Sequence, residues 1–369
     1  MNRFITAVCA AAIGVAAAVT ASGPAQGDPG VVDQVTDLDQ RIPGSATAER
    51  VVYTTRNSLG EPVRASGALF VPQGTPPPGG WPVIAWEHGT VGRADACAPS
   101  GTDFTFYRPY LENLLAQGYA VAATDYIGLG TPGEHAYLDG RAAAQASIDM
   151  VRAARAADPT LSSRWAAAGH SQGGHATLFT ASIAAVYAPE LDYRGAVAFA
   201  PGASITDTML LLGRPGTPDI LPAGMKTYTA YVLGGVRAAR PAFDLDAYLT
   251  PLGRRIVADG ARLCYDDMTA TLEGVSMADM FAKPLSEGDF EAVARPVLDV
   301  PLTGYTRPLL IVQGTNDIDV PAPMVWRQAA ELRAAGVEFT ITDYPGYDHM
   351  QALDATHAEV NPYLASLFR

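Results

Sequence analysis

Short runs of apolar residues recur along the chain, and longer stretches with helical spacing of apolar residues separate them. A short apolar run bounded by turn-forming residues is typical of a strand that is buried on both faces. Stretches 141–157 and 172–187 instead predict helices. The predicted strands lie within 81–89, 118–128, 164–171, 193–202, 307–314 and 337–344, and the first two are of this buried kind. This alternation predicts an α/β protein with a mostly parallel central sheet and helices on both faces.

One part of the chain breaks the alternation. Residues 204–306 contain no clear buried strand, and about a hundred residues between two core strands are too many for a loop. Four segments in this part are apolar on one side and predict helices: 208–213, 227–239, 246–256 and 278–285. We therefore expect a core formed by 26–203 and 307–369, with a mainly helical cap or lid at 204–306.

The first 25 residues predict a cleaved signal peptide. Arg3 precedes an apolar run from 4 to 19, and small residues follow this run. Cleavage after Ala21 or Ala25 satisfies the requirement for small residues. The alternative is a retained membrane anchor, for which the run is short and Ala-rich, and no later stretch approaches the length of a span. We expect a secreted, extracellular protein whose mature chain has no transmembrane segment.

Removal of this leader also removes Cys9 and leaves two cysteines, Cys97 and Cys264. In an oxidising compartment two cysteines most simply form one disulfide, and two buried free thiols are the alternative.

The net charge and the lack of certain motifs argue against several function classes. The net charge is −13 and no run of lysine or arginine occurs, so a nucleic acid partner is not expected. The chain has no H-E-x-x-H or C-x-x-C pattern, and the Gly-rich segment 125–130 lacks the lysine of a P-loop. We therefore expect neither a metal nor an organic cofactor.

The segment Gly169–Gly173 (GHSQG) matches the G-x-S-x-G pattern at a predicted junction of strand and helix. In that pattern the serine lies on a strained turn, and small residues on both sides let the strand and helix approach each other. Ser171 is therefore the candidate nucleophile. A glycine-rich turn that serves packing alone is the alternative.

A nucleophilic serine needs a base, and the base needs an orienting acid. In this architecture the acid and then the histidine follow the serine along the chain. His349 lies in a loop after the last predicted strand, whereas His357 lies in a predicted helix. Asp317 lies in the loop after strand 307–314, and Asp319 is interpreted as a cap of the next helix. The predicted triad is Ser171, Asp317 and His349.

The tetrahedral intermediate of acyl transfer carries a negative oxygen that needs preorganised donors. The backbone N–H of Gln172, directly after the serine, is the expected first donor. The turn after strand 81–89 supplies the second, which we expect to be the backbone N–H of Thr90. A shift of one or two residues in this turn assigns the role to Gly89 or His88.

Five segments occur in this order along the chain: WEHGTVGRADACAPS, DYIGLG, GHSQGG, GTNDIDVP and YDHM. Together they resemble the secretory lipase family of α/β-hydrolases, which comprises exported lipases of fungi and actinobacteria. The resemblance implies an α/β-hydrolase fold, an ester-hydrolysing enzyme with the predicted triad, a helical cap with a lid over an acyl-binding tunnel, and a Cys97–Cys264 bridge. Fungal members carry an acidic residue near the turn where this chain has His88-Gly89-Thr90, so the second oxyanion donor is the looser match.

The sequence thus predicts a secreted serine carboxylester hydrolase, lipase or esterase, that cleaves acyl esters such as acylglycerols through an acyl-enzyme on Ser171. Its partners are a small-molecule or lipid ester and, transiently, a lipid interface. A secreted serine peptidase of the same fold is an alternative, for which cap acids such as Asp244, Asp246 and Glu273 offer a carboxylate for a substrate amino terminus. Two further alternatives are an acyltransferase and a non-enzymatic binding protein on the same fold. The intact order of the triad residues argues against the non-enzymatic binding protein.

Overall fold

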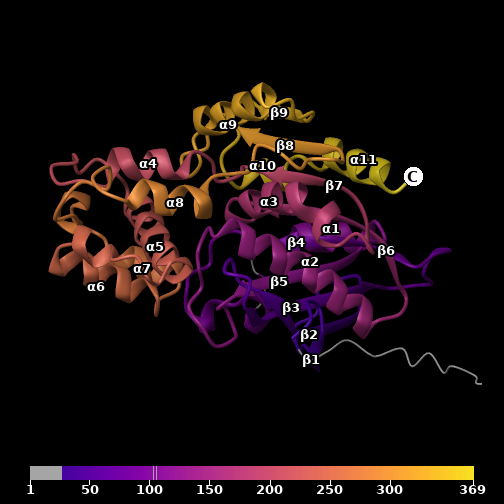
Figure 1. Cartoon of the computed structure of the whole chain (residues 1–369). Coiled ribbons are helices and arrows are strands. Elements are labelled where there is room, and N and C mark those ends of the chain that lie inside the picture. Colours follow the sequence, from indigo (N-terminus) through magenta and orange to yellow (C-terminus); the bar gives the residue numbers. More distant parts are fainter. Residues whose placement is uncertain (1–26, 103, 105) are drawn as a thin grey trace, which may run out of the picture.

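A computed structural model of the protein describes residues 27–102, 104 and 106–369. The predicted signal peptide at 1–25 lies outside these residues. Within them, no helix has both the length and the apolar character needed to cross a membrane. The described chain forms a large twisted sheet with helices packed around it (Figure 1). Its strands are β1 (Val32–Asp37), β2 (Ser45–Arg56), β3 (Pro62–Pro72), β4 (Trp81–Glu87), β5 (Ala120–Ile127), β6 (Leu161–His170), β7 (Asp192–Phe199), β8 (Leu309–Gly314) and β9 (Thr340–Tyr344).

The nine strands form one sheet in the order β1-β2-β3-β5-β4-β6-β7-β8-β9. The first three strands and β5 pair antiparallel, and the pairs from β5 through β9 are parallel. The parallel strands therefore present their carboxyl ends along one edge, where sites lie in such sheets. Strand β1 carries no apolar pattern because it is an edge strand whose residues are mostly exposed.

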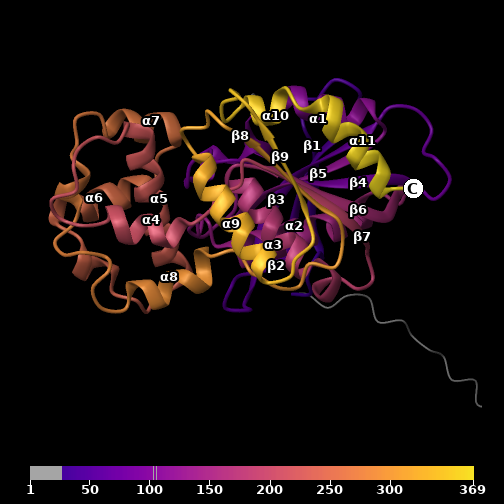
Figure 2. The same cartoon turned by 90° about the horizontal axis from the view of Figure 1, so that it is seen from above.

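Helices cover both faces of the sheet, as the alternation of strand and helix predicts. Figure 2 shows α1, α10 and α11 on one side of the strands and α2, α3 and α9 on the other. Their bounds are α1 (Arg108–Ala116), α2 (Gly140–Ala157), α3 (Gln172–Tyr187), α9 (Ala322–Ala334), α10 (Gln351–Asp354) and α11 (His357–Leu367). The predicted helix around His357 is thus two short helices, and His357 begins the second of them.

Strand β4 shows why the predicted strands are apolar without interruption. Val83 and Ala85 pack into the core on the α2–α3 side, whereas Ile84 and Trp86 pack into the core on the α1 side. Successive side chains of a strand point to opposite faces, so a strand between two helical layers has no solvent-facing position.

The chain between β7 and β8 folds into a separate helical layer that lies beside the sheet (Figures 1 and 2). Its helices are α4 (Ile205–Leu212), α5 (Ala223–Ala239), α6 (Pro251–Gly260), α7 (Tyr265–Thr271) and α8 (Phe290–Leu298). These helices share an apolar core of their own, which includes Tyr231, Val236 and Phe290. We refer to this layer as the cap.

Two predicted helices of the cap differ from the observed elements. Segment 246–256 is interrupted at Thr250, whose side chain accepts a hydrogen bond from the N–H of Gly253 and starts α6 at Pro251. Segment 278–285 is a single 3-10 turn, Met277–Met280, followed by irregular chain. In both segments apolar positions at helical spacing are present, but capping and proline override them.

A disulfide joins Cys97 of the core to Cys264, the residue that precedes α7 in the cap. This confirms the predicted bridge and excludes the alternative of two free thiols. Gly92 is needed beside it, because a Cβ at this position would lie within 3.0 Å of both the Cys97 sulfur and the Cys264 backbone. The bridge ties the cap to the sheet at one side of the site described next.

Candidate active site

Ser171 occupies a strained turn between β6 and α3. Its backbone angles are φ 60° and ψ −115°, in a region that residues with a Cβ rarely adopt. The turn needs glycine on both sides: a Cβ at Gly169 would overlap the Gly173 backbone, and a Cβ at Gly173 would overlap the backbone carbonyl of Glu87. The G-x-S-x-G spacing is therefore a packing requirement of this turn, which projects the serine beyond the sheet.

The neighbouring strand β7 and the first turn of α3 hold the backbone of this turn. The N–H of Ser171 donates to the carbonyl of Phe199 at 2.9 Å. The carbonyl of Ser171 accepts from the N–H groups of His175 at 3.0 Å and Gly202 at 3.1 Å. These three bonds leave the hydroxyl as the free group of the turn.

Asp317 and His349 form a hydrogen-bonded pair at the same edge of the sheet. The Asp317 loop follows β8 and the His349 loop follows β9, and these two strands are adjacent and parallel. His349 Nδ1 lies 2.6 Å from Asp317 Oδ2. Asp317 Oδ1 accepts from the N–H groups of Asp319 at 2.9 Å and Val320 at 2.8 Å. A proton on Nδ1 is thereby directed to the carboxylate, which leaves Nε2 of His349 as a proton acceptor.

Asp319 is not the helix cap that the sequence predicts. Helix α9 begins at Ala322 without a side-chain cap, and Asp319 instead accepts a hydrogen bond of 3.0 Å from Tyr228 of cap helix α5. Its carboxylate therefore connects the core to the cap beside the candidate triad.

His170 links the serine turn to His349. Its Nε2 lies 3.0 Å from the backbone carbonyl of His349, and the two imidazole rings are 4.4 Å apart. Burial, with the nearby His349 second, lowers the pKa of His170 to about 3, so His170 is neutral and donates this bond. Among the described residues, no hydrogen bond joins the Ser171 hydroxyl to His349.

The two predicted oxyanion donors have free N–H groups. Gln172 is the first residue of α3, where the N–H has no partner within the helix, and neither its N–H nor that of Thr90 donates to any described residue. Gly89 is unsuited to this role because its N–H donates to the Tyr107 hydroxyl at 2.9 Å. Tyr107 lies just before α1, and no sequence pattern pointed to it.

Glu87, at the end of β4, lies fully buried beneath this turn. It accepts hydrogen bonds from the hydroxyls of Thr177 and, at 2.6 Å, Thr180 of α3. Burial raises the pKa of the Glu87 carboxyl to about 7, and these bonds partly oppose the rise. The carboxyl thus ties the start of α3 to β4, and sequence analysis did not identify it.

Ser171 opens into a small apolar cavity of about 80 Å³, which we call the Ser171 cavity. Cap side chains, including Met209, Leu212 and Val232, form much of its wall. The cap acids considered for a peptidase do not line it within the described part of the chain: Asp244, Asp246 and Glu273.

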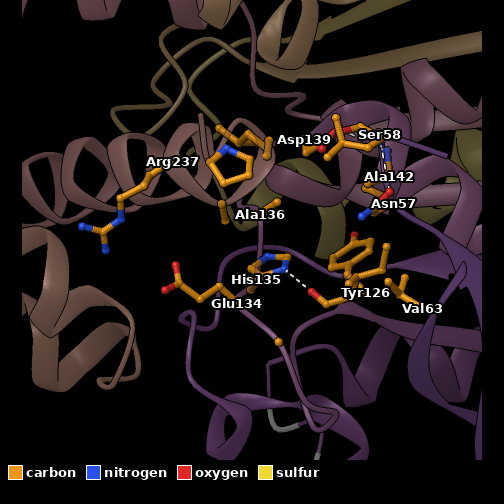
Figure 3. A pocket seen from close by; sticks show the side chains of 18 of the residues that line it. Asn57, Ser58, Val63, Tyr126, Glu134, His135, Ala136, Asp139, Ala142 and Arg237 are labelled. Atoms are coloured by element: carbon orange, nitrogen blue, oxygen red, sulfur yellow. Dashed lines mark hydrogen bonds between the residues drawn. The ribbon is translucent and has the colours of Figure 1, made fainter. Parts of the chain in front are cut away.

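A second hollow, the large cleft, measures about 440 Å³ (Figure 3). It lies between the hairpin of β2 and β3, the loop that connects β5 to α2, and the end of cap helix α5. Leu138 and Gln172 line both hollows and so form part of the wall between them.

Two features bear on metals and cofactors. Ligand atoms of Asp317, Asp319 and His349 lie within 4.8 Å of one another, but Asp317 and His349 already bond to each other, and Asp317 also accepts from two backbone N–H groups. Gly128, Gly130 and Gly133 have the spacing of a dinucleotide loop, yet α2 begins only at Gly140, so these glycines do not open a helix as that function requires.

The sequence and the fold were compared with those of known proteins. The sequence model described as "Secretory lipase" matches residues 103–358. The chain is 26% identical over 337 residues to a Mycobacterium tuberculosis protein described as a probable inactive lipase, covering 85% of this chain and 72% of that protein. It is 25% identical over 334 residues to lipase A of Moesziomyces aphidis, covering 84% of this chain and 69% of that protein.

Solved structures share the fold. Lipase A of Candida antarctica superposes with a TM-score of 0.74 at 21% identity, over 89% of this chain and 83% of that one. The rice cell wall degrading esterase LipA of Xanthomonas oryzae superposes with a TM-score of 0.75 at 19% identity, over 91% and 99% of the two chains. The fold is that of the α/β-hydrolases, as the sequence predicts.

Proposed function

Because the chain belongs to the secretory lipase family, we propose that it is a serine hydrolase of carboxylic esters. One observation carries this proposal: the Asp317–His349 pair, at 2.6 Å, lies at the sheet edge that also presents Ser171 in its strained turn. A serine, a base and an orienting acid in this chain order are what acyl transfer requires.

The reaction proceeds in two halves. His349 Nε2 takes the proton of the Ser171 hydroxyl, whose oxygen attacks the ester carbonyl carbon. The N–H groups of Gln172 and Thr90 stabilise the negative oxygen that results. Collapse of this intermediate breaks the bond to the alcohol oxygen, which leaves with the proton from His349. Water then attacks the acyl-enzyme with the same proton transfers and releases the carboxylic acid.

Among the described residues no hydrogen bond joins Ser171 to His349, and this does not argue against the pair. Hydrogen bonds of catalytic groups are often long without substrate and shorten when it binds. The His349 ring bonds to Asp317 through Nδ1, so Nε2 remains available for the serine proton.

The surroundings of Ser171 favour an acyl ester over a peptide. Its cavity is mainly apolar, and among the described residues no cap carboxylate lines it for a substrate amino terminus; the core carboxylate that does, Asp319, is hydrogen-bonded to Tyr228. The apolar side chains of Leu211, Ile220 and Ile318 are 64%, 81% and 75% exposed, and the residues next to them in sequence line the same cavity. We infer from this rim a transient contact with a lipid surface.

The Cys97–Cys264 disulfide supports an extracellular location, since such bonds persist in oxidising compartments. The Mycobacterium tuberculosis relative is described as a probable inactive lipase. In the present chain all three triad residues are present, and two of them are bonded as catalysis requires. These features support an active enzyme.

The test combines Ser171→Ala with a matched change, Ser182→Ala, which removes a buried hydroxyl from α3, the helix that follows Ser171. A fluorophosphonate probe is expected to label the wild-type and Ser182→Ala proteins but not Ser171→Ala. Turnover of p-nitrophenyl esters should fall by roughly 10³-fold or more in Ser171→Ala alone. Equal activity of the two variants would overturn the proposal.

Substrates then separate the alternatives. Wild-type protein is assayed with p-nitrophenyl esters of rising acyl length, emulsified triacylglycerol, a peptide amide, and an ester in the presence of added alcohol. Dominant cleavage of the amide identifies a peptidase, and a dominant transfer product identifies an acyltransferase.

A further inference from the structure

The loop between β5 and α2, residues 128–139, contacts both predicted oxyanion donors. Gln172 Nε2 lies 3.0 Å from His135 Nε2. His135 Nδ1 lies 2.9 Å from the backbone carbonyl of Ile127, a bond that Figure 3 shows as a dashed line. A carbonyl only accepts, so Nδ1 carries the proton and Nε2 accepts from the amide of Gln172. This assignment fixes the orientation of the amide.

His135 keeps this role over a wide pH range. It is fully buried, and burial is the main cause that lowers its pKa to about 3. The neutral ring therefore remains an acceptor for Gln172. The oxygen Oε1 of Gln172 has no partner among the described residues, so His135 alone anchors this buried side chain.

The same loop holds the second donor through Tyr137. The hydroxyl of Tyr137 lies 2.6 Å from the Thr90 hydroxyl. Tyr137 also lines the Ser171 cavity. Two side chains two residues apart thus reach the two halves of one oxyanion hole.

Contacts with Arg93 and with cap helix α5 hold the loop in place. Arg93, buried in the core, donates from Nε to the carbonyl of His135 at 2.9 Å. Two glycines let cap helix α5 pack closely against Arg93 and the loop. A Cβ at Gly234 would overlap the Arg93 guanidinium, and a Cβ at Gly235 would overlap the backbone of Tyr137. The loop is therefore packed between the core and the cap.

We propose that His135 and Tyr137 are positioning residues that hold the backbone donors of Gln172 and Thr90 in line with the reacting carbonyl. The inference rests on the proposed function. Donors stabilise the oxyanion only at defined positions, so a loosened donor weakens the transition state more than it weakens substrate binding. Neither residue touches the reacting atoms.

The experiment measures kcat and KM of His135→Leu and Tyr137→Phe on a soluble p-nitrophenyl ester. The expected result is a fall in kcat of roughly 10- to 100-fold with KM changed by less than about threefold, the pattern of an interaction made in the transition state. The inhibition constant of a trifluoromethyl ketone, which forms an oxyanion on the serine, should rise by the same factor as kcat/KM falls. His135→Gln, which keeps an acceptor for Gln172, should restore most of kcat.

The chain offers a matched control for each variant. His357→Leu removes a half-buried histidine whose Nδ1 lies 3.3 Å from Asn113 Nδ2, and Tyr110→Phe removes a buried hydroxyl without a partner among the described residues. Both controls should keep kcat within about twofold of wild type per folded molecule. Folded molecules are counted by complete fluorophosphonate labelling and by thermal melting.

Three outcomes decide the proposal. Selective loss of kcat with weakened ketone binding supports it. Equal losses in the His135→Leu and His357→Leu proteins, or wild-type kcat in Tyr137→Phe, overturn it. If His135→Leu does not fold, Tyr137→Phe and its control Tyr110→Phe carry the comparison. Failure of the wild-type protein to react with the fluorophosphonate would instead refute the proposed function itself.

Discussion

Replacing Asp317 with asparagine exchanges one oxygen of the side chain for an amide nitrogen. The remaining oxygen can still accept the two backbone bonds, from Asp319 and Val320, that hold the loop after β8. The new NH₂ group then faces His349 Nδ1, where the native carboxylate oxygen accepts at 2.6 Å. Two donors cannot face each other, so His349 must move its proton to Nε2.

An imidazole with its proton on Nε2 cannot accept the proton of Ser171. We therefore expect kcat/KM to fall by roughly 10⁴-fold, or about 5.5 kcal/mol of transition-state stabilisation. The fold should be little affected because the backbone bonds of the loop remain. Asp317→Ala would be a poorer test, since it leaves two N–H groups without an acceptor at a cost of roughly 1–3 kcal/mol each.

The assay is steady-state hydrolysis of a short p-nitrophenyl ester, with thermal melting to confirm folding. Asp319→Asn is the matched control, because an amide oxygen at that position can still accept from Tyr228. The loss of kcat/KM in Asp319→Asn should be at least about a hundredfold smaller than the loss in Asp317→Asn. The reasoning is refuted if Asp317→Asn keeps more than a tenth of wild-type activity, and a larger loss in Asp319→Asn would make Asp319 the orienting acid.

Three further predictions concern stability. Gly173→Ala should lower the melting temperature, because its Cβ would overlap a backbone carbonyl of β4. Gly101→Ala is the control, since no described atom lies within 4 Å of the added Cβ, and its melting temperature should not change. Equal melting temperatures of the two variants would contradict this prediction. Replacing Cys97 and Cys264 by alanine removes a cross-link between residues that are 167 positions apart. Denaturant titration should show that the free energy of unfolding falls by up to roughly 5 kcal/mol, and an unchanged free energy of unfolding would contradict this prediction. Stability should also fall below about pH 6.5, because burial lowers the native pKa of three histidines and the unfolded chain binds their protons first. These pKa values are about 3 for His135, about 3 for His170 and about 4 for His175. The native carboxyls of Glu87 and Asp149, whose pKa values burial raises to about 7 and about 6, bind protons over the same range and oppose this loss. The net difference of about one proton gives a slope of about 1.4 kcal/mol per pH unit, and a melting temperature that stays constant from pH 7 to 5 would contradict it.

Much of the fold was predictable because the core strands lie between two helical layers. Burial on both faces leaves an uninterrupted apolar run, which is visible in β4 through the alternate packing of Val83 and Ile84. The edge strand β1 has no such constraint, and its mostly exposed residues gave no signal. The apolar spacing of the cap segment 246–256 predicts one helix, because this spacing does not reveal that Thr250 caps a new helix in its middle.

The sequence by itself determined the fold class, the family and the loops in which site residues were to be sought. It could do so because strand burial and the tight serine turn impose constraints on residues close together in the chain. The tertiary structure decided which groups meet: Asp317 with His349, Asp319 with Tyr228, and Gly89 with Tyr107. It alone also placed His135 and Tyr137 against the side chains of the two predicted oxyanion donors, 37 and 47 residues away along the chain. Such contacts depend on the packing of separate strands and loops, and no local pattern of residues records them.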